Sequence, residues 1–355
     1  MKLYIIWLYI FLCFGYMTGS DWRDYELEYS SASHMYGESE FGFTYIFDLA
    51  SKVGMDFWLF SGLMKCLYLY AQIRLIKLLT SNITTCLSIS MVTTLLFMLV
   101  DYPMRFTAAA TFVIFAMPYL FQKKVLRFFL LSSIGIIFHN TILITILVCL
   151  FCYYIPEKLL SINKYVLSIV FIAFALLASN FSRIAIVQEI GMAYFIESGM
   201  RSYSTYLIEN NNSFYTLGSL INVFLACFVF FVKDVFLNEA PQNKLILKFA
   251  IVASFLFRVL LVIPVGYRLS VPLSIFSTII IVSFCYRHRR KFIYFFFVLY
   301  ILTLCKDLYN GFVYIPYSNS IPHIITQDHL PYDERDQYNF DKYKERKGRP
   351  FERND

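Results

Sequence analysis

Residues 104–144 read MRFTAAATFVIFAMPYLFQKKVLRFFLLSSIGIIFHNTILI, and this stretch decides the fold class. Two apolar runs, at 106–121 and 125–138, are joined by a short basic turn. A helix that spans a bilayer needs about 20 mainly apolar residues, so the first run predicts a membrane helix. The second run and the next one, at 141–155, are short for independent crossings. They could be tilted, be extended by their flanks or form a re-entrant pair buried in protein.

The same pattern extends over most of the 355 residues, of which 59% are hydrophobic and only 15% are charged. Soluble domains are about 45–50% apolar and about 25% charged, so the composition indicates an integral membrane protein. We expect an all-α, polytopic membrane helix bundle of about eleven transmembrane segments. The segments lie near residues 3–17, 55–76, 83–100, 106–121, 125–138, 141–155, 165–179, 214–232, 245–264, 267–286 and 292–309. We interpret the first as a retained helix rather than a cleaved signal peptide.

The basic residues predict the orientation of this bundle. With Lys2 in the cytoplasm, the basic loops fall on the cytoplasmic side and the acid-rich loop 18–54 and the polar loop 180–213 fall outside. We therefore expect a bundle at 1–310 in the cytoplasmic (inner) membrane. The tail, 311–355, mixes charges of both signs and is expected to be poorly ordered. The net charge of +7 is explained by these loops and does not imply binding to nucleic acid.

All eight cysteines lie inside apolar runs, so the sequence shows no disulfide framework. Cys149 and Cys152 form a CxxC pair, but no His or acidic residue lies near it in sequence, and we interpret the pair as buried packing. We find no convincing cluster of metal ligands.

Several cations and one imidazole are predicted to share the outer face. Arg105 opens a helix, His139 lies between two apolar runs, and Arg268 lies in the short segment PVGYRLSVP. Each has a plain structural interpretation, such as contact with lipid phosphate, a core hydrogen bond or a tight hairpin. Together they suit an anionic, lipid-linked substrate, because a guanidinium binds phosphate oxygens in a bidentate manner and a His can accept a proton near neutral pH. Arg183 and Arg201, in the loop 180–213, are also on this face.

Four stretches make the chain resemble the EpsG/Wzy-type exopolysaccharide (O-antigen-like) polymerases. They are GSDWRDYELEY with ESEFGFTYIF, the 104–144 stretch, GYRLSVPLSIF, and the closing YIPYSNSI. The 104–144 stretch is the most specific, with its Arg-led helix, basic turn and second helix ending in Phe-His. Members commonly have a further N-terminal helix and an Arg shortly before the Gly-x-Asp, and this chain has neither. Either this member does without them, or the natural start lies upstream of Met1.

The resemblance implies a GT-C-like bundle with an active site on the extracytoplasmic side. It implies that a growing glycan leaves its polyprenyl diphosphate carrier and is transferred to a sugar hydroxyl of a new repeat unit. Arg105 and Arg268 would hold the diphosphate, and His139 would act as base or orient the substrate. Asp21 is the competing candidate for the base. This scheme requires no metal and no cofactor.

Further residues follow from the same matches. Tyr25 and Glu40 correspond to the two motifs of the first outer loop and are expected to bind substrate. Tyr267, beside the late arginine, is expected to do the same, and Arg201 is matched by position only. Expected partners are a polyprenyl-diphosphate-linked oligosaccharide and the bilayer, with a flippase and a chain-length regulator acting nearby.

Two other classes remain open. A membrane acyltransferase that modifies surface glycans also uses a membrane His and Arg. A lipid-linked glycan flippase or transporter would need no chemistry, but such transporters often contain internal repeats, and the sequence shows none.

Overall fold

The structure, a computed structural model, describes residues 2–19, 21–31, 40–181, 217–237, 241–260, 266–310 and 317–347. Nearly all of these residues are helical, so the all-α prediction is confirmed. The two strands of the described chain are short: β1 (Gly15–Tyr16) pairs antiparallel with β2 (Ser318–Asn319). This pairing joins the start of the chain to its C-terminal part.

Each of the eleven apolar segments coincides with helical structure in the described ranges, while their number as membrane crossings stays a prediction. Those of the first half of the chain are α1 (Lys2–Leu8), η1 (Tyr9–Cys13), α4 (Phe57–Leu79), α5 (Ile83–Ser90), η3 (Met91–Leu95), η4 (Phe97–Asp101), α6 (Met104–Phe121), α7 (Val125–Ser133), η5 (Ile134–Ile137) and α8 (Ile142–Tyr154). After the short η6 (Glu157–Ser161) follow α9 (Lys164–Phe181), α12 (Leu217–Leu237), α13 (Pro241–Leu260), η7 (Gly266–Leu273), α14 (Ser274–His288) and α15 (Phe292–Asn310).

Three helices of the described chain are long and apolar enough to cross a membrane. They are Met104–Phe121, Gly218–Leu237 and Arg268–His288, and shorter apolar helices flank them. Long apolar helices and an apolar composition make this chain a membrane protein. The first of the three, α6, packs against α4, α7 and α8. Its Ala108, Ala109 and Ala110 are fully or almost fully buried, because small side chains let neighbouring helices approach closely.

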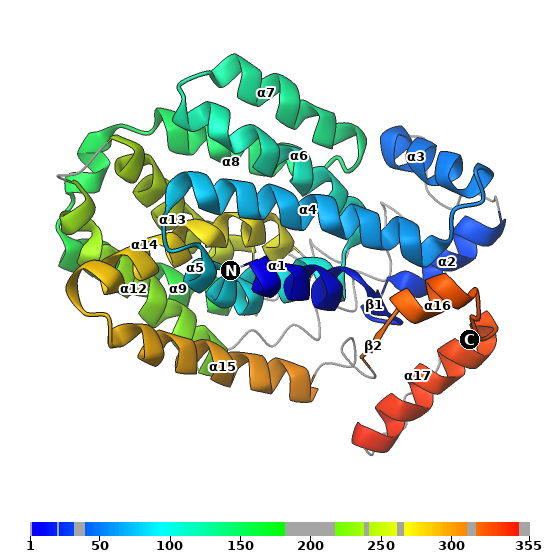
Figure 1. Cartoon of the computed structure of the whole chain (residues 1–355). Helices are drawn as coiled ribbons and strands as arrows, with labels where there is room; N and C mark the ends of the chain where they lie inside the picture. Colours follow the sequence, from blue (N-terminus) through cyan, green and yellow to red (C-terminus); the bar gives the residue numbers. More distant parts are fainter. Residues whose placement is uncertain are drawn as a thin grey trace.

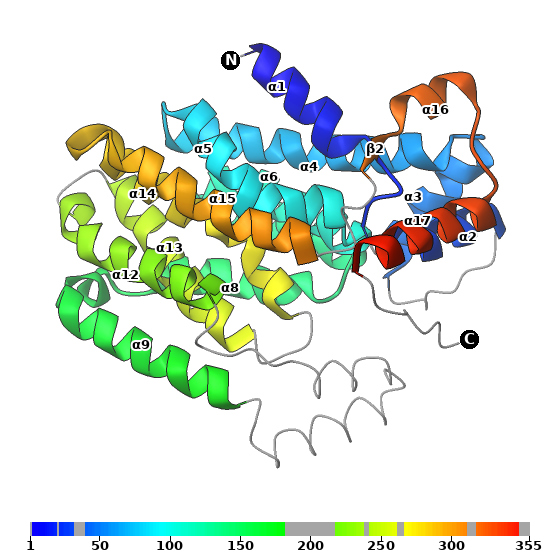
Figure 2. The same cartoon turned by 90° about the horizontal axis from the view of Figure 1, so that it is seen from below.

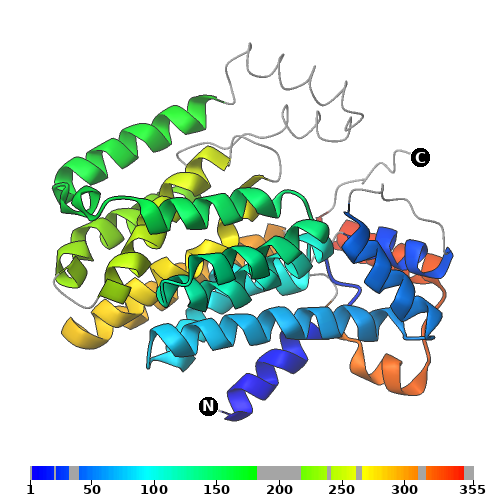
Figure 3. The ribbon, with the colours of Figure 1, turned by 90° about the horizontal axis from the view of Figure 1, so that it is seen from above.

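Four helices outside the apolar segments gather at one end of the bundle (Figure 1). They are α2 (Trp22–Ser31), α3 (Phe41–Lys52), α16 (Ile321–Thr326) and α17 (Tyr332–Lys347). The view from above shows the blue α2 and α3 beside the orange and red C-terminal helices (Figure 3). Parts of the first loop and of the tail, which are far apart in sequence, therefore share one end of the molecule.

Residues 317–347, which belong to the C-terminal tail, make specific contacts with the first part of the chain, while the order of the tail as a whole stays a prediction. Figure 2 shows α17 alongside α2. Arg335 is 4% exposed and donates to Glu26 at 2.7 Å and to the Leu330 carbonyl at 2.8 Å. Asp336 forms an ion pair with Arg23 of α2. The mixed charges of the tail look like a solvated segment in sequence, but they pair with charges some 300 residues earlier.

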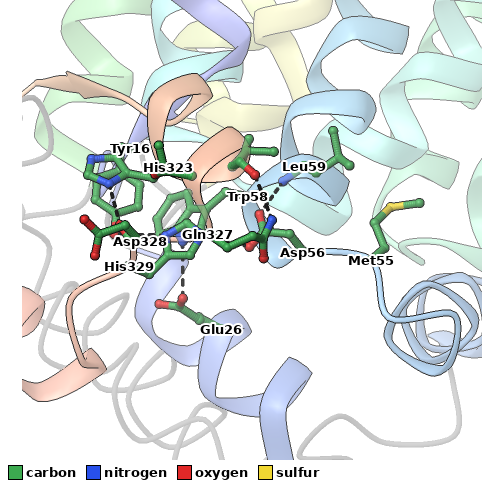
Figure 4. A network of polar contacts seen from close by, with 12 residues as sticks. Tyr16, Glu26, Met55, Asp56, Trp58, Leu59, His323, Gln327, Asp328 and His329 are labelled. Carbon is green, nitrogen blue, oxygen red and sulfur yellow. Dashed lines mark hydrogen bonds and ion pairs between the residues drawn. The ribbon is translucent and has the colours of Figure 1, made fainter.

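A second attachment lies before α17, in the network of Figure 4. His329 Nε2 lies 3.0 Å from Asp56 Oδ2, and its Nδ1 lies 3.3 Å from the Tyr16 hydroxyl. Asp56 also caps α4 by accepting from the Leu59 N–H at 3.0 Å. His323 stacks on the Tyr16 ring, with 4.3 Å between the centroids. The tail therefore contacts β1 and the start of α4 as well as α2.

The first prediction concerns the pair of buried Arg335 and half-buried Glu26. Arg335→Ala is expected to lower the free energy of unfolding by about 3 kcal/mol, because it leaves the sheltered Glu26 carboxylate without its cation. Thermal unfolding of the purified protein in detergent measures the change. Lys244→Ala is the control, since Lys244 pairs with the mostly exposed Glu157 and an exposed pair contributes little. Equal unfolding temperatures for the two variants would contradict the prediction.

Candidate functional site

A carboxylate joins the predicted arginine to the predicted histidine at the end of the bundle that carries α2 and α3. Arg105 Nη1 donates to Glu40 Oε2 at 2.5 Å, and His139 Nδ1 lies 2.5 Å from Glu40 Oε1. Arg105 Nε donates to the Tyr25 hydroxyl at 2.9 Å. We call Glu40, Arg105, His139 and Tyr25 the Glu40 cluster. Its members come from four separate segments of the chain.

Arg105 reaches the cluster because of the backbone just before α6. The π-helical η4 ends at Asp101, and Tyr102 adopts a left-handed conformation with φ 51°. Pro103 follows as the N-cap residue of α6, a position compatible with the restricted φ of proline. Arg105 thus lies in the first turn of an otherwise apolar helix. A cation at the end of such a helix avoids the cost of the bilayer centre.

Tyr25 is brought to Arg105 by a close approach that requires a glycine. Gly19 has a φ of +89°, and a Cβ at this position would lie 2.4 Å from the Asp101 carbonyl oxygen. The chain before α2 therefore touches the chain before α6, where only glycine fits. Tyr25 follows in the second turn of α2, buried, with its ring edge to Phe43 of α3 at 5.8 Å between centroids.

Glu40 is brought to His139 by a second close approach. A Cβ on Gly42 would lie 2.9 Å from both the Cγ1 and the carbonyl oxygen of Ile137. Gly42 lies two residues after Glu40, and Ile137 lies two residues before His139. Because Gly42 has no side chain, α3 and η5 can touch at this point. Their close contact sets the distance between the Glu40 carboxylate and the His139 imidazole.

The surroundings of Glu40 favour its ionised form. Burial alone raises the pKa of this carboxyl, but the hydrogen bond and charge of His139, together with the charge and hydrogen bond of Arg105, outweigh burial and hold the pKa below its ordinary value. Glu40 is therefore a carboxylate at neutral pH. The side chains of Arg105, Glu40 and His139 are 24%, 11% and 23% exposed, so the cluster is sheltered but reachable from solvent.

The contact with Glu40 defines what His139 can do. When the carboxylate accepts a proton from Nδ1, the neutral ring carries its lone pair on Nε2. The ring also meets Phe106 edge-on, with 6.0 Å between the centroids. A partner on one nitrogen and an aromatic neighbour fix the orientation of the ring. The arrangement can accept a proton from a substrate hydroxyl beside a permanently charged guanidinium.

The other predicted residues lie elsewhere or outside the described residues. Asp21 precedes α2, and its charge adds to the rise in the pKa of Asp24 that burial causes. Arg268 lies in η7, 6.0 Å from the Phe97 ring centroid, and its buried Nε finds no hydrogen-bond partner among the described residues. Nor does any hydrogen bond or ion pair of the described chain join Arg268 to the Glu40 cluster. Tyr267 precedes it in η7, with a side chain outside the described part of the structure, and Arg201 lies outside the described ranges.

Lys65 is a buried cation that the sequence pattern did not single out. It lies in α4, and its Nζ is 4.4 Å from the centroid of the Tyr102 ring. Tyr102 precedes Arg105 by three residues. The sequence feature that could have identified Lys65 is its position as a single lysine within an apolar run. Arg258, a buried arginine that also lies within an apolar run, donates to the side chain and the carbonyl of the half-buried Ser219 at 2.7 Å each.

The second prediction concerns the approach at Gly19. Gly19→Ala is expected to reduce the activity that depends on the Glu40 cluster more than tenfold, because the new Cβ displaces the Asp101 carbonyl. It is also expected to destabilise the protein, because a left-handed alanine adds about 1–2 kcal/mol of backbone strain. Gly54→Ala is the matched control, with a φ of +71° and no atom within 4 Å of its Cβ. Thermal unfolding measures the stability of both variants, and complementation of a strain that lacks the gene measures their activity. Equal effects would show that backbone strain alone matters at Gly19.

Comparison with known proteins adds one match. The model of the EpsG family matches residues 2–319, which include every member of the Glu40 cluster and end at β2. Neither the curated proteins nor the solved structures yield a match. The helices α16 and α17 follow the matched range.

Proposed function

Because the chain belongs to the EpsG family, we propose that it polymerises polyprenyl-diphosphate-linked oligosaccharide repeat units on the extracytoplasmic face of the cytoplasmic membrane. The family suggests a glycosyl transfer of the polymerase type, and the product would be an O-antigen, a capsule or an exopolysaccharide. The observation that carries the proposal is the Glu40 carboxylate between Arg105 and His139. This contact of an imidazole and a guanidinium with one carboxylate supports a role for His139 as base and for Arg105 as diphosphate ligand.

In the proposed reaction, a sugar hydroxyl of the new repeat unit attacks the anomeric carbon of the growing chain. The bond from that carbon to the carrier phosphate breaks, and the polyprenyl diphosphate leaves with the electron pair. The hydroxyl proton moves to His139 Nε2, while Glu40 stabilises the resulting imidazolium through Nδ1. Arg105 lies beside this pair and would offset the negative charge that develops on the diphosphate.

The other predicted site residues have proposed roles in binding the substrate. Arg268 would be a second diphosphate ligand. Its buried Nε has no hydrogen-bond partner in the described part of the chain, and this supports the role, because a buried guanidinium nitrogen calls for an acceptor. Arg201 and Tyr267 stay proposed substrate contacts. His139 is favoured over Asp21 as the base, because the histidine shares a carboxylate with Arg105. A flippase that supplies repeat units and a chain-length regulator stay proposed partners.

The test is the length ladder of surface polysaccharide from a strain that lacks the gene. The deletion should leave single capped repeat units, and the intact chain should restore the ladder. A normal ladder in the deletion strain would refute the proposal. A full-length polymer that lacks a modification would indicate an acyltransferase, and repeat units trapped in the cytoplasm would indicate a flippase.

A further inference from the structure

The helix that carries Glu40 at its N-terminus is apolar on two faces. Gly42, Phe43, Phe47 and Ala50 of α3 are buried against the rest of the protein. On another face, Phe41, Tyr45 and Leu49 follow one another at four-residue spacing, and Val53 continues the row just after the helix. Their side chains are 61%, 68%, 50% and 66% exposed. We call these four residues the α3 stripe.

The position of the α3 stripe relates it to the Glu40 cluster. Phe41 is the neighbour of Glu40, whose carboxylate binds Arg105. A lipid diphosphate held at Arg105 would begin its hydrocarbon chain within a few ångströms of its phosphates. The stripe extends from there along the twelve residues of α3, about 18 Å of apolar surface. With twelve residues, α3 is too short to cross a membrane. The stripe is therefore an exposed apolar surface at the end of the bundle.

The apolar surface continues beyond α3. Through Gly42, α3 lies against Ile137 of η5. The segment that leads to Ile137 exposes Leu126, Leu130 and Ile134, again at four-residue spacing, and belongs to the apolar helical run Val125–Ile137. An exposed apolar row on such a helix is where lipid hydrocarbon contacts a membrane protein. The N-terminal end of α3, where the stripe begins, thus lies beside both the end of a lipid-facing helix and the cluster that would bind the head of the substrate.

We propose that the α3 stripe binds the polyprenyl chain of the lipid-linked donor and so directs its diphosphate to Arg105. This inference rests on the proposed function and adds a hydrocarbon subsite to it. The carrier chain is favoured over bulk lipid as occupant, because it is tethered to the diphosphate at the start of the stripe and has a high effective concentration there. The contact is hydrophobic, and its contribution grows with the apolar area covered.

The experiment compares two donors with the same saccharide diphosphate, one on a long polyprenyl chain and one on a short geranyl chain. Donor binding and turnover are measured separately on purified protein in nanodiscs. Tyr45→Ser with Leu49→Ser is expected to raise the Kd and KM for the long-chain donor about tenfold. The values for the geranyl donor and kcat should stay the same. The control is Ile325→Ser, at a 75% exposed apolar side chain of α16.

Each outcome decides the inference. Unchanged constants for the long-chain donor, or an equal rise for both donors, would overturn it, and the latter would indicate a general role in anchoring to the bilayer. Wild-type protein that binds neither donor would overturn the inference and the proposed function together. Wild-type protein that binds the long-chain donor through the stripe, but joins no sugars, would refute only the proposed polymerase activity.

Discussion

Glu40→Gln is expected to reduce polymer formation by about 10²–10⁴-fold while leaving the protein folded. The glutamine has nearly the same shape, but it removes the charge that stabilises an imidazolium at His139 and pairs with Arg105. Its amide can also donate to Nδ1, which would place the imidazole proton on Nε2 and block proton acceptance there. The measurement is kcat with a lipid-linked donor in proteoliposomes, with the surface length ladder as the cellular readout.

Glu157→Gln is the control for this prediction. Glu157 is a mostly exposed carboxylate that also accepts from a cation, Lys244, at 2.9 Å. Its replacement should leave polymer formation unchanged. Full activity of Glu40→Gln would show that the carboxylate has no part in the reaction, and the assignment of His139 as base would lose its support. An inactive variant that is also missing from the membrane fraction would show a role in folding instead.

Arg105→Lys is expected to be almost as damaging as Arg105→Ala, with kcat/KM reduced about 10²–10³-fold. The guanidinium uses Nε for Tyr25 and Nη1 for Glu40 at the same time. A lysine keeps the positive charge, but its single ammonium group cannot reproduce the planar fork toward both acceptors and a diphosphate. Turnover and donor binding should both fall, because this side chain would contact the leaving group in the ground state and in the transition state.

The control for the arginine variant is Arg127→Lys, at an exposed position of α7. It should retain the activity of the wild type. Wild-type turnover of Arg105→Lys would contradict a geometric role for the guanidinium and would leave only its charge as relevant. Arg105→Ala would then test the charge: loss of activity in this variant would show that the positive charge is required, and full activity would show that Arg105 has no role in the reaction.

The sequence determined the class of this protein because class depends on local properties. An apolar run of sufficient length forms a helix in a membrane whatever its neighbours do, since its backbone must satisfy its own hydrogen bonds. The apolar segments, the helix that begins near Arg105 and the family were therefore predictable, and the helices and the family are confirmed. Motif matches also identified Tyr25, Glu40, Arg105 and His139 as candidates.

Only the tertiary structure decided how these candidates meet. Glu40 and His139 are 99 residues apart, and their contact depends on the close approach of α3 to η5 at Gly42. Arg335 and Glu26 are 309 residues apart, so the mixed charges of the tail did not reveal in sequence that these two side chains meet. Pairing of this kind arises from the packing of whole helices, and hydrophobic periodicity specifies each helix but not which charged side chains its surface will meet.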